Sequence, residues 1–273
     1  MNDEAPLSDQ LFGRFSELLF RKTGIALKEY KKYLVMNRLS PSVGPGKMFP
    51  TFDSFYQALV AETDGTLSQA FINALTTNYS YFFRDQVHFQ VMGQYLRERG
   101  VDETYLRFWS AAASTGEEAY SMAITLANQG TGLPADRRIL ATDISTKVLA
   151  HAIEGVYGSE AILRCVDPRD QKKYFELVGD EKKFRVRDGL RGNVDFRLLN
   201  LQDEFPFRKK MDIIFLRNVM IYFGAKEKAE LIEKMYDHLK RGGLLFVGLS
   251  ESLAGMGHRF VTYKNSIFQK QGT

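Results

Sequence analysis

Two carboxylates follow a single glycine at a predicted junction between a strand and a helix. The apolar run Leu106 to Ser110 leads through Gly116 into Glu117 and Glu118, where a helical pattern begins. In doubly wound sheets the ligand lies at this kind of turn. Phosphate binding needs several glycines so that backbone amides can approach the ligand, and this turn has one. Two carboxylates suit a positively charged ligand, although they could also only stabilise the helix N-terminus.

A third acid, Asp143, ends the next predicted strand, Arg138 to Thr142. A carboxylate at that strand end can accept hydrogen bonds from both hydroxyls of a ribose. A single-glycine turn together with a strand-end acid therefore indicates a nucleoside that carries no pyrophosphate. S-adenosylmethionine is a common cofactor of that kind, because it has an ammonium group, a ribose and a sulfonium centre.

The elements that must position these acids alternate between short apolar strands and helical segments from about Leu106 onward. This alternation is typical of an α/β fold with a doubly wound, mainly parallel sheet. A helix is predicted from Lys226 to Leu239, ended by Gly242-Gly243, and a hairpin from Phe260 to Lys270. The predicted strands are Leu106 to Ser110, Arg138 to Thr142, Val194 to Leu198, Met211 to Leu216 and Leu244 to Leu249.

Residues 1–75 are instead predicted to form a small helical N-terminal domain. Apolar residues recur at helical spacing from Leu11 to Leu19, after Ser8 or Asp9 as a cap and before Gly24 as a stop. Residues 76–273 then form the second domain. Within it, the short runs Lys183 to Val186 and Val194 to Leu198 are close enough to pair antiparallel, so we expect a small inserted β-subdomain at about 181–199.

Composition excludes several classes of protein. The chain has 273 residues, of which 44% are hydrophobic and 26% charged, so a disordered or fibrous protein is a poor interpretation. No apolar run approaches the roughly 20 residues of a membrane helix, and the acidic N-terminus does not resemble a signal peptide, so we expect a cytoplasmic protein without membrane insertion. Cys165 and four scattered histidines give no ligand cluster for a metal.

The charge distribution bears on possible partners. A formal charge of +4, from 37 basic and 33 acidic residues, is too small to indicate nucleic acid. The segment from Leu11 to Ser40 is locally basic, with Glu17 and Glu29 as its only acids, and could meet an acidic surface or could simply be solvated. Its basic residues are Arg14, Arg21, Lys22, Lys28, Lys31, Lys32 and Arg38.

Six motifs, in order along the chain, resemble those of the chemotaxis receptor methyltransferases, the CheR family. They are NALTTNYSYFFRD at 73–85, WSAAASTGEEAYS at 109–121, ATDIS at 141–145, NL at 200–201, IFLRNVMIYF at 214–223 and GGLLFVGLSE at 242–251. The resemblance implies a helical N-terminal domain and a methyltransferase domain with a β-subdomain. It also implies transfer of a methyl group from S-adenosylmethionine to glutamates in the helical cytoplasmic region of methyl-accepting chemoreceptors, with S-adenosylhomocysteine as product.

The resemblance also implies roles for residues at matching positions. It places Arg84 and Tyr222 beside the methyl group that is transferred, gives Glu118 the methionine ammonium, and gives Asp143 the ribose. Leu216 and Leu249 depart from the family, which often has cysteine and histidine there. The cofactor contacts that the resemblance implies are Asn78, Ser80, Arg84, Glu118, Asp143, Asn200, Leu201, Arg217 and Asn218.

These residue types suit esterification of a carboxylate. A glutamate with an ordinary pKa is already ionised at neutral pH, so no general base is required. None of the four histidines lies in a recognised site motif. An alternative is a signalling module that binds S-adenosylmethionine without catalysis, but the intact motifs argue against it. A nucleic-acid or small-molecule methyltransferase usually has a proline-rich motif where this chain has Arg217-Asn218-Val219-Met220.

Overall fold

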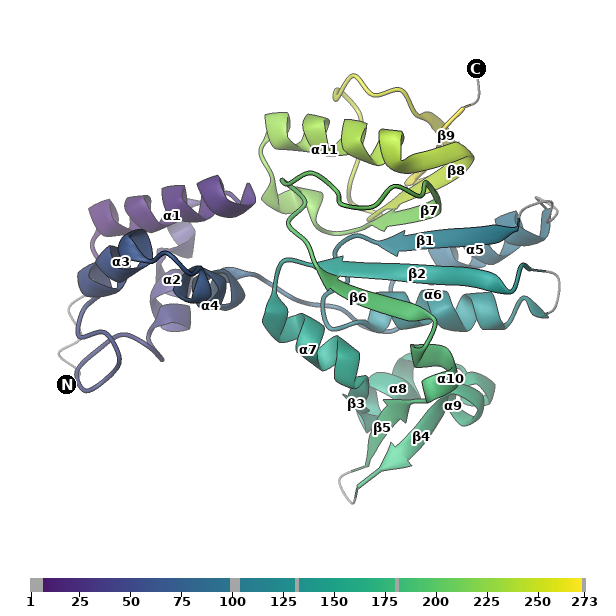
Figure 1. The fold of residues 1–273 in the computed structure, drawn as a ribbon, viewed down its shortest axis with the longest axis horizontal. Helices are drawn as coiled ribbons and strands as arrows, with labels where there is room; N and C mark the ends of the chain where they lie inside the picture. The colour runs from purple at the N-terminus through teal and green to yellow at the C-terminus, as the bar shows by residue number, and fades with distance from the viewer. Residues whose placement is uncertain (1–6, 99–103, 131–132, 180–181, 272–273) are drawn as a thin grey trace. The chain divides into compact units, whose positions relative to one another are not determined.

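The computed structural model describes residues 7–98, 104–130, 133–179 and 182–271, which form two compact units (Figure 1). The first unit runs to Thr77 and also contains Tyr222–Glu227. The second unit contains Asn78–Ile221 and Lys228–Thr273. The sequence placed the division after residue 75 and gave no sign that Tyr222–Glu227 would group with the N-terminal helices.

The first unit is helical and packs around aromatic rings. The Ser8 side chain accepts a hydrogen bond from the Leu11 N–H at the start of its first helix, and Gly24, with φ of 72°, ends that helix. Phe15 is fully buried, with ring contacts to Phe55 and Phe71. The elements are α1 (Asp9–Thr23), η1 (Glu29–Lys31), α2 (Lys32–Leu39), α3 (Phe52–Ala61) and α4 (Thr66–Leu75).

The second unit is built on a seven-stranded sheet of order β6-β2-β1-β7-β8-β10-β9. The first five strands in this order are mutually parallel, and β10 and β9 add an antiparallel hairpin at one edge, as predicted. The fold class is therefore confirmed as a doubly wound, mainly parallel sheet. The strands are β1 (Tyr105–Ser110), β2 (Asp136–Asp143), β6 (Val194–Leu198), β7 (Met211–Leu216), β8 (Leu239–Val247), β9 (Val261–Lys264) and β10 (Ile267–Gln269).

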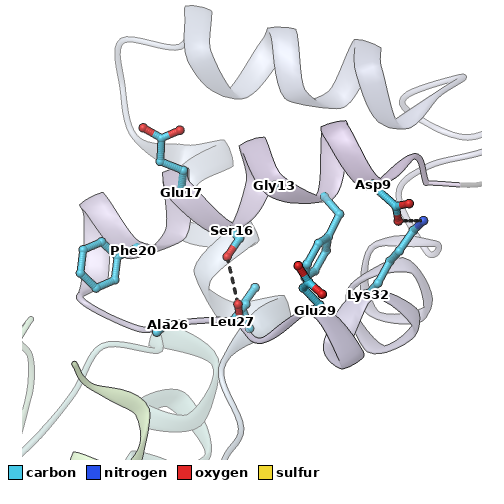
Figure 2. Close-up of a pocket in the computed structure, with 10 residues that line it drawn as sticks. Asp9, Gly13, Ser16, Glu17, Phe20, Ala26, Leu27, Glu29 and Lys32 are labelled. Carbon is cyan, nitrogen blue, oxygen red and sulfur yellow. Dashed lines mark hydrogen bonds and ion pairs between the residues drawn. The ribbon is translucent and has the colours of Figure 1, made fainter. Parts of the chain in front are cut away.

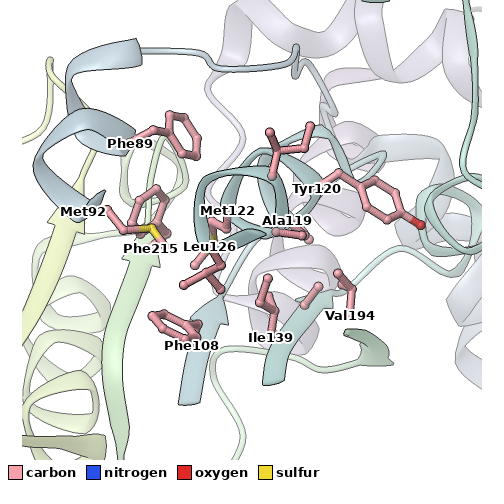
Figure 3. Close-up of a cluster of buried hydrophobic side chains, with 14 of the residues drawn as sticks. Phe89, Met92, Phe108, Ala119, Tyr120, Met122, Leu126, Ile139, Val194 and Phe215 are labelled. Atoms are coloured by element: carbon pink, nitrogen blue, oxygen red, sulfur yellow. The ribbon is translucent and has the colours of Figure 1, made fainter. Parts of the chain in front are cut away.

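Helices cover this sheet, and its core lies beneath them. Phe108, Phe215 and Phe246 point from three adjacent strands into one buried cluster with α5 (Gln86–Glu98) and α6 (Glu117–Ala127), which lie behind the sheet in Figure 1. Figure 3 shows this cluster, in which apolar side chains of the two helices fill the space above the strands. The unit also contains α7 (Thr146–Glu154) and, from Lys228 onward, α11 (Ala225–His238).

The inserted β-subdomain differs from its prediction. Lys183–Val186 forms β5, the middle strand of a three-stranded antiparallel sheet with β3 (Val156–Gly158) and β4 (Phe175–Val178). The prediction that it pairs with Val194–Leu198 is wrong, because that segment is β6 and pairs parallel with β2 in the main sheet. The intervening helices are α8 (Ser159–Cys165), α9 (Pro168–Tyr174) and α10 (Asp188–Arg191).

A second correction concerns the end of the long C-terminal helix. Gly242-Gly243 was expected to end it, but α11 ends at His238 and β8 begins directly at Leu239. Gly243 still has a structural role, because a Cβ there would lie 2.9 Å from the Lys240 carbonyl and 3.0 Å from the Asp212 carbonyl. The glycine therefore allows β7 and β8 to approach at the irregularity in their pairing.

Candidate active site

The predicted site residues follow the carboxyl ends of parallel strands. Asp143 ends β2, Arg217 and Asn218 follow β7, and Glu118 opens the helix after β1. The chain leaves β1 toward β2 on one side, whereas β7 and β8 lie on the other, so the switch in strand order falls between β1 and β7. Ligands of doubly wound sheets bind at this position. The topology thus brings together residues that are far apart in the sequence.

Arg217 is the centre of a buried ionic cluster. Its side chain is 1% exposed, and its guanidinium donates at 2.8 Å to Glu118 Oε2 and at 2.7 Å to Asp85 Oδ2. A third bond, 2.6 Å long, goes to the Arg84 carbonyl. The guanidinium also lies near the rings of Phe89 and Phe215. A buried arginine is held by such contacts because its charge would otherwise be unpaired.

Glu118 is the acid that the resemblance assigns to an ammonium group. The Ser110 hydroxyl donates to its Oε1 at 2.6 Å, and Arg217 occupies one lone pair of its Oε2. Burial raises the pKa of Glu118, and the charge of Arg217 and the bond from Ser110 oppose this effect. A carboxylate has about four acceptor positions, so Glu118 keeps capacity for a further donor.

Asp143 is fixed by the loop after β1 as well as by its own strand. Its Oδ2 accepts the Ser114 N–H at 2.8 Å, and its Oδ1 accepts the Ser145 N–H at 3.0 Å. Burial raises the pKa of Asp143, and these backbone donors oppose the rise. The Ile144 N–H is a third backbone donor to the same carboxylate. The carboxylate is therefore held in a fixed plane, which suits recognition of a pair of hydroxyls.

Asn218 is held in an unusual backbone conformation by an acid that the sequence analysis did not assign. Its φ is 57°, in the left-handed region, and its N–H donates to Glu251 Oε2 at 2.7 Å. The same oxygen accepts the Gly248 N–H at 2.8 Å. A Cβ on Gly248 would lie 2.6 Å from the side-chain nitrogen Nδ2 of Asn218 and 2.9 Å from Glu251 Oε2, so a larger residue there would displace these two side chains. Glu251 thus joins the loops after β7 and β8.

Asn200 and Leu201 form a tight turn after β6. The Asn200 side-chain oxygen accepts the Gln202 N–H at 3.1 Å, and Leu201 is buried. Lys234 of α11 fixes this turn by donating to the carbonyls of Leu201, Gln202 and Asp203, at 3.2, 2.7 and 3.1 Å. The residues predicted to flank the adenine therefore lie at the carboxyl edge of the sheet. Their backbone is held in place by the hydrogen bonds from Lys234.

For Arg84, Asn78 and Ser80, fewer contacts to the other predicted site residues are seen. Arg84 is half-buried, donates to the Tyr79 carbonyl at 3.1 Å and lies 5.9 Å from the ring centres of Tyr79 and Tyr81. Asn78 and Ser80 precede it on the same segment and are half-buried.

Tyr222 belongs to the other compact unit. There its carbonyl accepts the Ala26 N–H at 3.0 Å, and the next residue, Phe223, forms a bridge with Ile25. The position of Tyr222 beside Arg84 stays a prediction from the resemblance.

His88 is a buried histidine behind the ionic cluster. It has 0% exposure, neither ring nitrogen has a partner among the described residues, and its ring packs against Phe215 and Phe246. Burial, with the nearby charge of Arg217, lowers the pKa of His88 to about 4. The ring is therefore neutral at physiological pH and serves packing.

This depressed pKa predicts acid sensitivity. Between pH 6.5 and pH 4 the histidine is protonated in the unfolded chain, where its pKa is near 6.5, but stays neutral in the folded chain. The free energy of unfolding should therefore fall as the pH drops from about 6.5 to about 4. The His88 contribution should be about 2–3 kcal/mol across that window. Denaturant unfolding at several pH values measures it. His88→Leu should make the free energy of unfolding less dependent on pH, and His151→Gln should not. If His88→Leu loses as much stability in acid as the unmodified protein does, His88 is not the cause of the acid sensitivity.

Figure 2 shows a pocket within the first unit. It has a volume of about 630 Å³ and lies between α1 and the segment before α2. Gly13 contributes to the hollow, because a Cβ there would meet nothing within 4 Å. Asp9, Glu17 and Glu29 line the pocket, and Lys32 pairs with Asp9. It contains none of the predicted site residues.

The part of the chain that the structure describes has neither a metal-binding cluster nor a membrane-spanning helix. Within residues 7–98, 104–130, 133–179 and 182–271, no three metal-ligating side chains gather. None of the helices in those same ranges has the length and apolar character needed to cross a bilayer.

The sequence analysis missed three polar residues of the site. Asp85 and Glu251 end two of the motifs, and Ser114 lies inside a third, but their chemistry depends on contacts that the motifs do not reveal. Ser114 Oγ, Arg217 Nε and Glu251 Oε1 are buried and have no hydrogen-bond partner among the described residues. Unsatisfied polar atoms cost free energy unless something bonds them, so these three atoms, on loops that follow β1, β7 and β8, are candidate contacts for a bound molecule.

Comparison with known proteins agrees with this geometry. Residues 10–76 match the family described as CheR methyltransferase, all-alpha domain, and residues 78–268 match CheR methyltransferase, SAM binding domain. The chain is 38% identical to a chemotaxis protein methyltransferase of Vibrio parahaemolyticus, over 93% of each chain. The Escherichia coli protein of that name is 36% identical, over 98% of this chain and 93% of its own. Chemotaxis protein methyltransferase 2 of Pseudomonas aeruginosa is 39% identical, over 94% and 91%. The chain belongs to the CheR methyltransferase family.

Proposed function

We propose that this protein transfers a methyl group from S-adenosylmethionine to glutamate side chains of chemoreceptors and so forms glutamate methyl esters. The observation that carries the proposal is the pair of acids at the sheet edge, Glu118 and Asp143, beside a turn with a single glycine. This arrangement suits an amine and a ribose rather than a pyrophosphate. The relatives named chemotaxis protein methyltransferase support the same class of reaction.

The residues at the edge fit the cofactor by their chemistry. Glu118 would bind the methionine ammonium, Asp143 the two ribose hydroxyls, and the Asn200-Leu201 turn the adenine. The unpartnered Ser114 Oγ and Glu251 Oε1 offer further polar contacts in the same place. When bound, S-adenosylmethionine supplies a methyl group on a positively charged sulfur. The other residues that would contact the cofactor are Asn78, Ser80, Arg84, Arg217 and Asn218.

The acceptor chemistry requires positioning rather than base catalysis. An ionised glutamate oxygen forms the new bond to the methyl carbon, while the carbon–sulfur bond breaks and its electron pair stays on sulfur. No proton has to be removed, which agrees with His88 being buried and neutral. We assign Arg84 and Tyr222 to orienting the carboxylate. Holding reactants in line can supply several kcal/mol of rate acceleration.

One experiment tests the function directly. The protein is incubated with methyl-labelled S-adenosylmethionine and cytoplasmic fragments of chemoreceptors, and the labelled product is then treated with alkali. We expect label on the receptor fragments that is released as methanol, because carboxyl methyl esters hydrolyse in base. Base-stable label would indicate N- or O-ether methylation and contradict the proposal. Cofactor binding without any transfer to the fragments would favour a non-catalytic signalling module.

Removing either orienting side chain should slow transfer. We expect Arg84→Ala and Tyr222→Phe each to lower the methylation rate at saturating cofactor by about tenfold or more, because the acceptor carboxylate loses a hydrogen-bond donor. The rate is measured with the labelled assay above. Arg185→Ala, in the inserted β-subdomain, is a control that should leave the rate unchanged. Near-normal rates in both site variants would remove the assignment.

The basic residues of the first unit are candidates for receptor docking. Arg14 and Lys32 form ion pairs with Asp53 and Asp9, whereas Arg21 and Lys28 are exposed. Exposed cations can attract an acidic helical surface by charge complementarity. We therefore propose that Arg21 and Lys28 contribute to binding the glutamate-rich helical region of chemoreceptors, in the cytoplasm, without nucleic acid or membrane insertion.

A further inference from the structure

Asp85 is a carboxylate of the site that neither the sequence motifs nor the family resemblance assigns. It follows Arg84 and takes a φ of 54°, in the left-handed region that side chains rarely adopt. Its Oδ2 lies 2.7 Å from the Arg217 guanidinium, and its side chain is 18% exposed. A residue kept in this conformation is held there by its surroundings, and here the ion pair to Arg217 is one of the restraints.

The charges around Arg217 do not balance within the ion-pair cluster. One guanidinium, almost completely buried, contacts two carboxylates, those of Asp85 and Glu118. The three groups together carry one net negative charge when both acids are ionised. Arg84 also lies close enough to lower the pKa of Glu118, but its side chain is half exposed, so solvent screens its charge more strongly. His88, whose pKa burial and the charge of Arg217 lower, is neutral.

Without Asp85, the remaining pair of Arg217 and Glu118 would have no net charge. Arg217 would then keep a neutral partner, the Arg84 carbonyl, on one terminal nitrogen, and Glu118 would be the carboxylate left in the cluster to compensate its charge. Glu118 would then offer little attraction to a second cation. With Asp85 present, half of the guanidinium is occupied, and Glu118 shares its charge with only one of the two terminal nitrogens.

We propose that Asp85 is a positioning residue that gives the site its selectivity for the ammonium group of the cofactor. It does so by balancing Arg217, so that the charge of Glu118 is left for the ligand. This inference rests on the proposed function and extends it to a residue that touches Arg217 rather than the cofactor. It predicts that changing Asp85 weakens the binding of ligands that have the ammonium group and not of ligands that lack it. A purely structural role would weaken the binding of both.

The test compares two ligands that differ in a single group. Calorimetric titration measures the affinity of the full chain for S-adenosylhomocysteine and for its deaminated analogue, in which hydrogen replaces the ammonium group. Asp85→Asn should weaken S-adenosylhomocysteine binding by about tenfold and leave the affinity for the deaminated analogue within about twofold of its original value. The ratio of the two affinities is independent of the fraction of protein that is folded.

Two variants serve as controls. Asp85→Glu keeps the charge and should retain a ratio close to that of the unmodified protein. Asp136→Asn removes an Asp–Arg ion pair at the opposite end of β2, where Asp136 lies 2.8 Å from Arg107, and should leave the ratio unchanged. Equal weakening of both ligands in Asp85→Asn, or no weakening of either, would overturn the inference. Failure of the unmodified protein to bind S-adenosylhomocysteine would overturn the proposed function itself.

Discussion

Replacing Arg217 with methionine should lower the free energy of unfolding by about 3–5 kcal/mol, because two largely buried carboxylates would lose their shared cation. The Asp85 and Glu118 side chains are only 18% and 12% exposed, so water cannot fully replace the guanidinium. Methionine fills a similar volume and keeps the packing against Phe89 and Phe215. Denaturant unfolding, followed by circular dichroism, measures the change.

A control variant and a double variant show how much of this loss of stability comes from the buried ion pairs of Arg217. Arg197 pairs with Asp195 at 3.9 Å on the surface of the same sheet, and Arg197→Met should cost less than about 1 kcal/mol. Adding Asp85→Asn to Arg217→Met removes one of the stranded charges and should restore part of the lost stability. If Arg217→Met behaves like the surface variant, the cluster is not the stabilising feature that its burial indicates.

Much of the site could be predicted because parallel strands place their carboxyl ends at one edge. Glu118, Asp143 and Arg217 each follow an apolar run that reads as a strand, and the topology rule for doubly wound sheets then brings them together. This topology rule can be applied without knowing which side chains contact each other. Short apolar runs and the acids after them therefore indicate the edge of the sheet, whereas a role for Arg217 came from the family resemblance alone.

Contacts between distant residues could not be predicted in the same way. Asp85 and Arg217 are 132 positions apart, and Glu251 meets Asn218 across 33 positions. Both pairs depend on backbone conformations with positive φ, at Asp85 and Asn218, which local propensity does not favour for residues other than glycine. Such exceptions to local rules are expected where a functional site imposes them.

Strand pairing was the other point at which local pattern failed. Val194–Leu198 is close in sequence to Lys183–Val186, which favours a hairpin, yet α10 and the following turn carry the chain back to β2. Val194 and Phe196 are buried in the core of the main sheet, whereas the small sheet closes with β4 and β3. Burial of these two side chains against α6 and β2 decides the pairing, and a sequence alone does not show which surface is available.

Replacing Glu118 with glutamine should weaken S-adenosylhomocysteine binding by about 100-fold. The substitution keeps the shape of the side chain and an acceptor for the Ser110 hydroxyl, but it removes the charge that would face the ligand ammonium. It also turns an NH₂ group or a neutral oxygen toward Arg217, which stays paired with Asp85, so the cluster no longer has a net negative charge to attract the ammonium. Charge-assisted hydrogen bonds contribute about 1.5–3 kcal/mol, and each 1.4 kcal/mol is about tenfold in affinity. Calorimetric titration measures the loss.

Glu117 provides the matched control, because it has the same side chain one position earlier on the same helix. Its carboxylate accepts the Thr115 hydroxyl at 2.7 Å and takes no part in the contacts of Arg217, so Glu117→Gln should leave the affinity within about threefold. A comparable loss in both variants would show that the charge of the helix N-terminus, rather than a specific carboxylate, attracts the cofactor. A selective loss in Glu118→Gln would instead locate the amine-binding charge on the one glutamate that Arg217 and Ser110 hold in place.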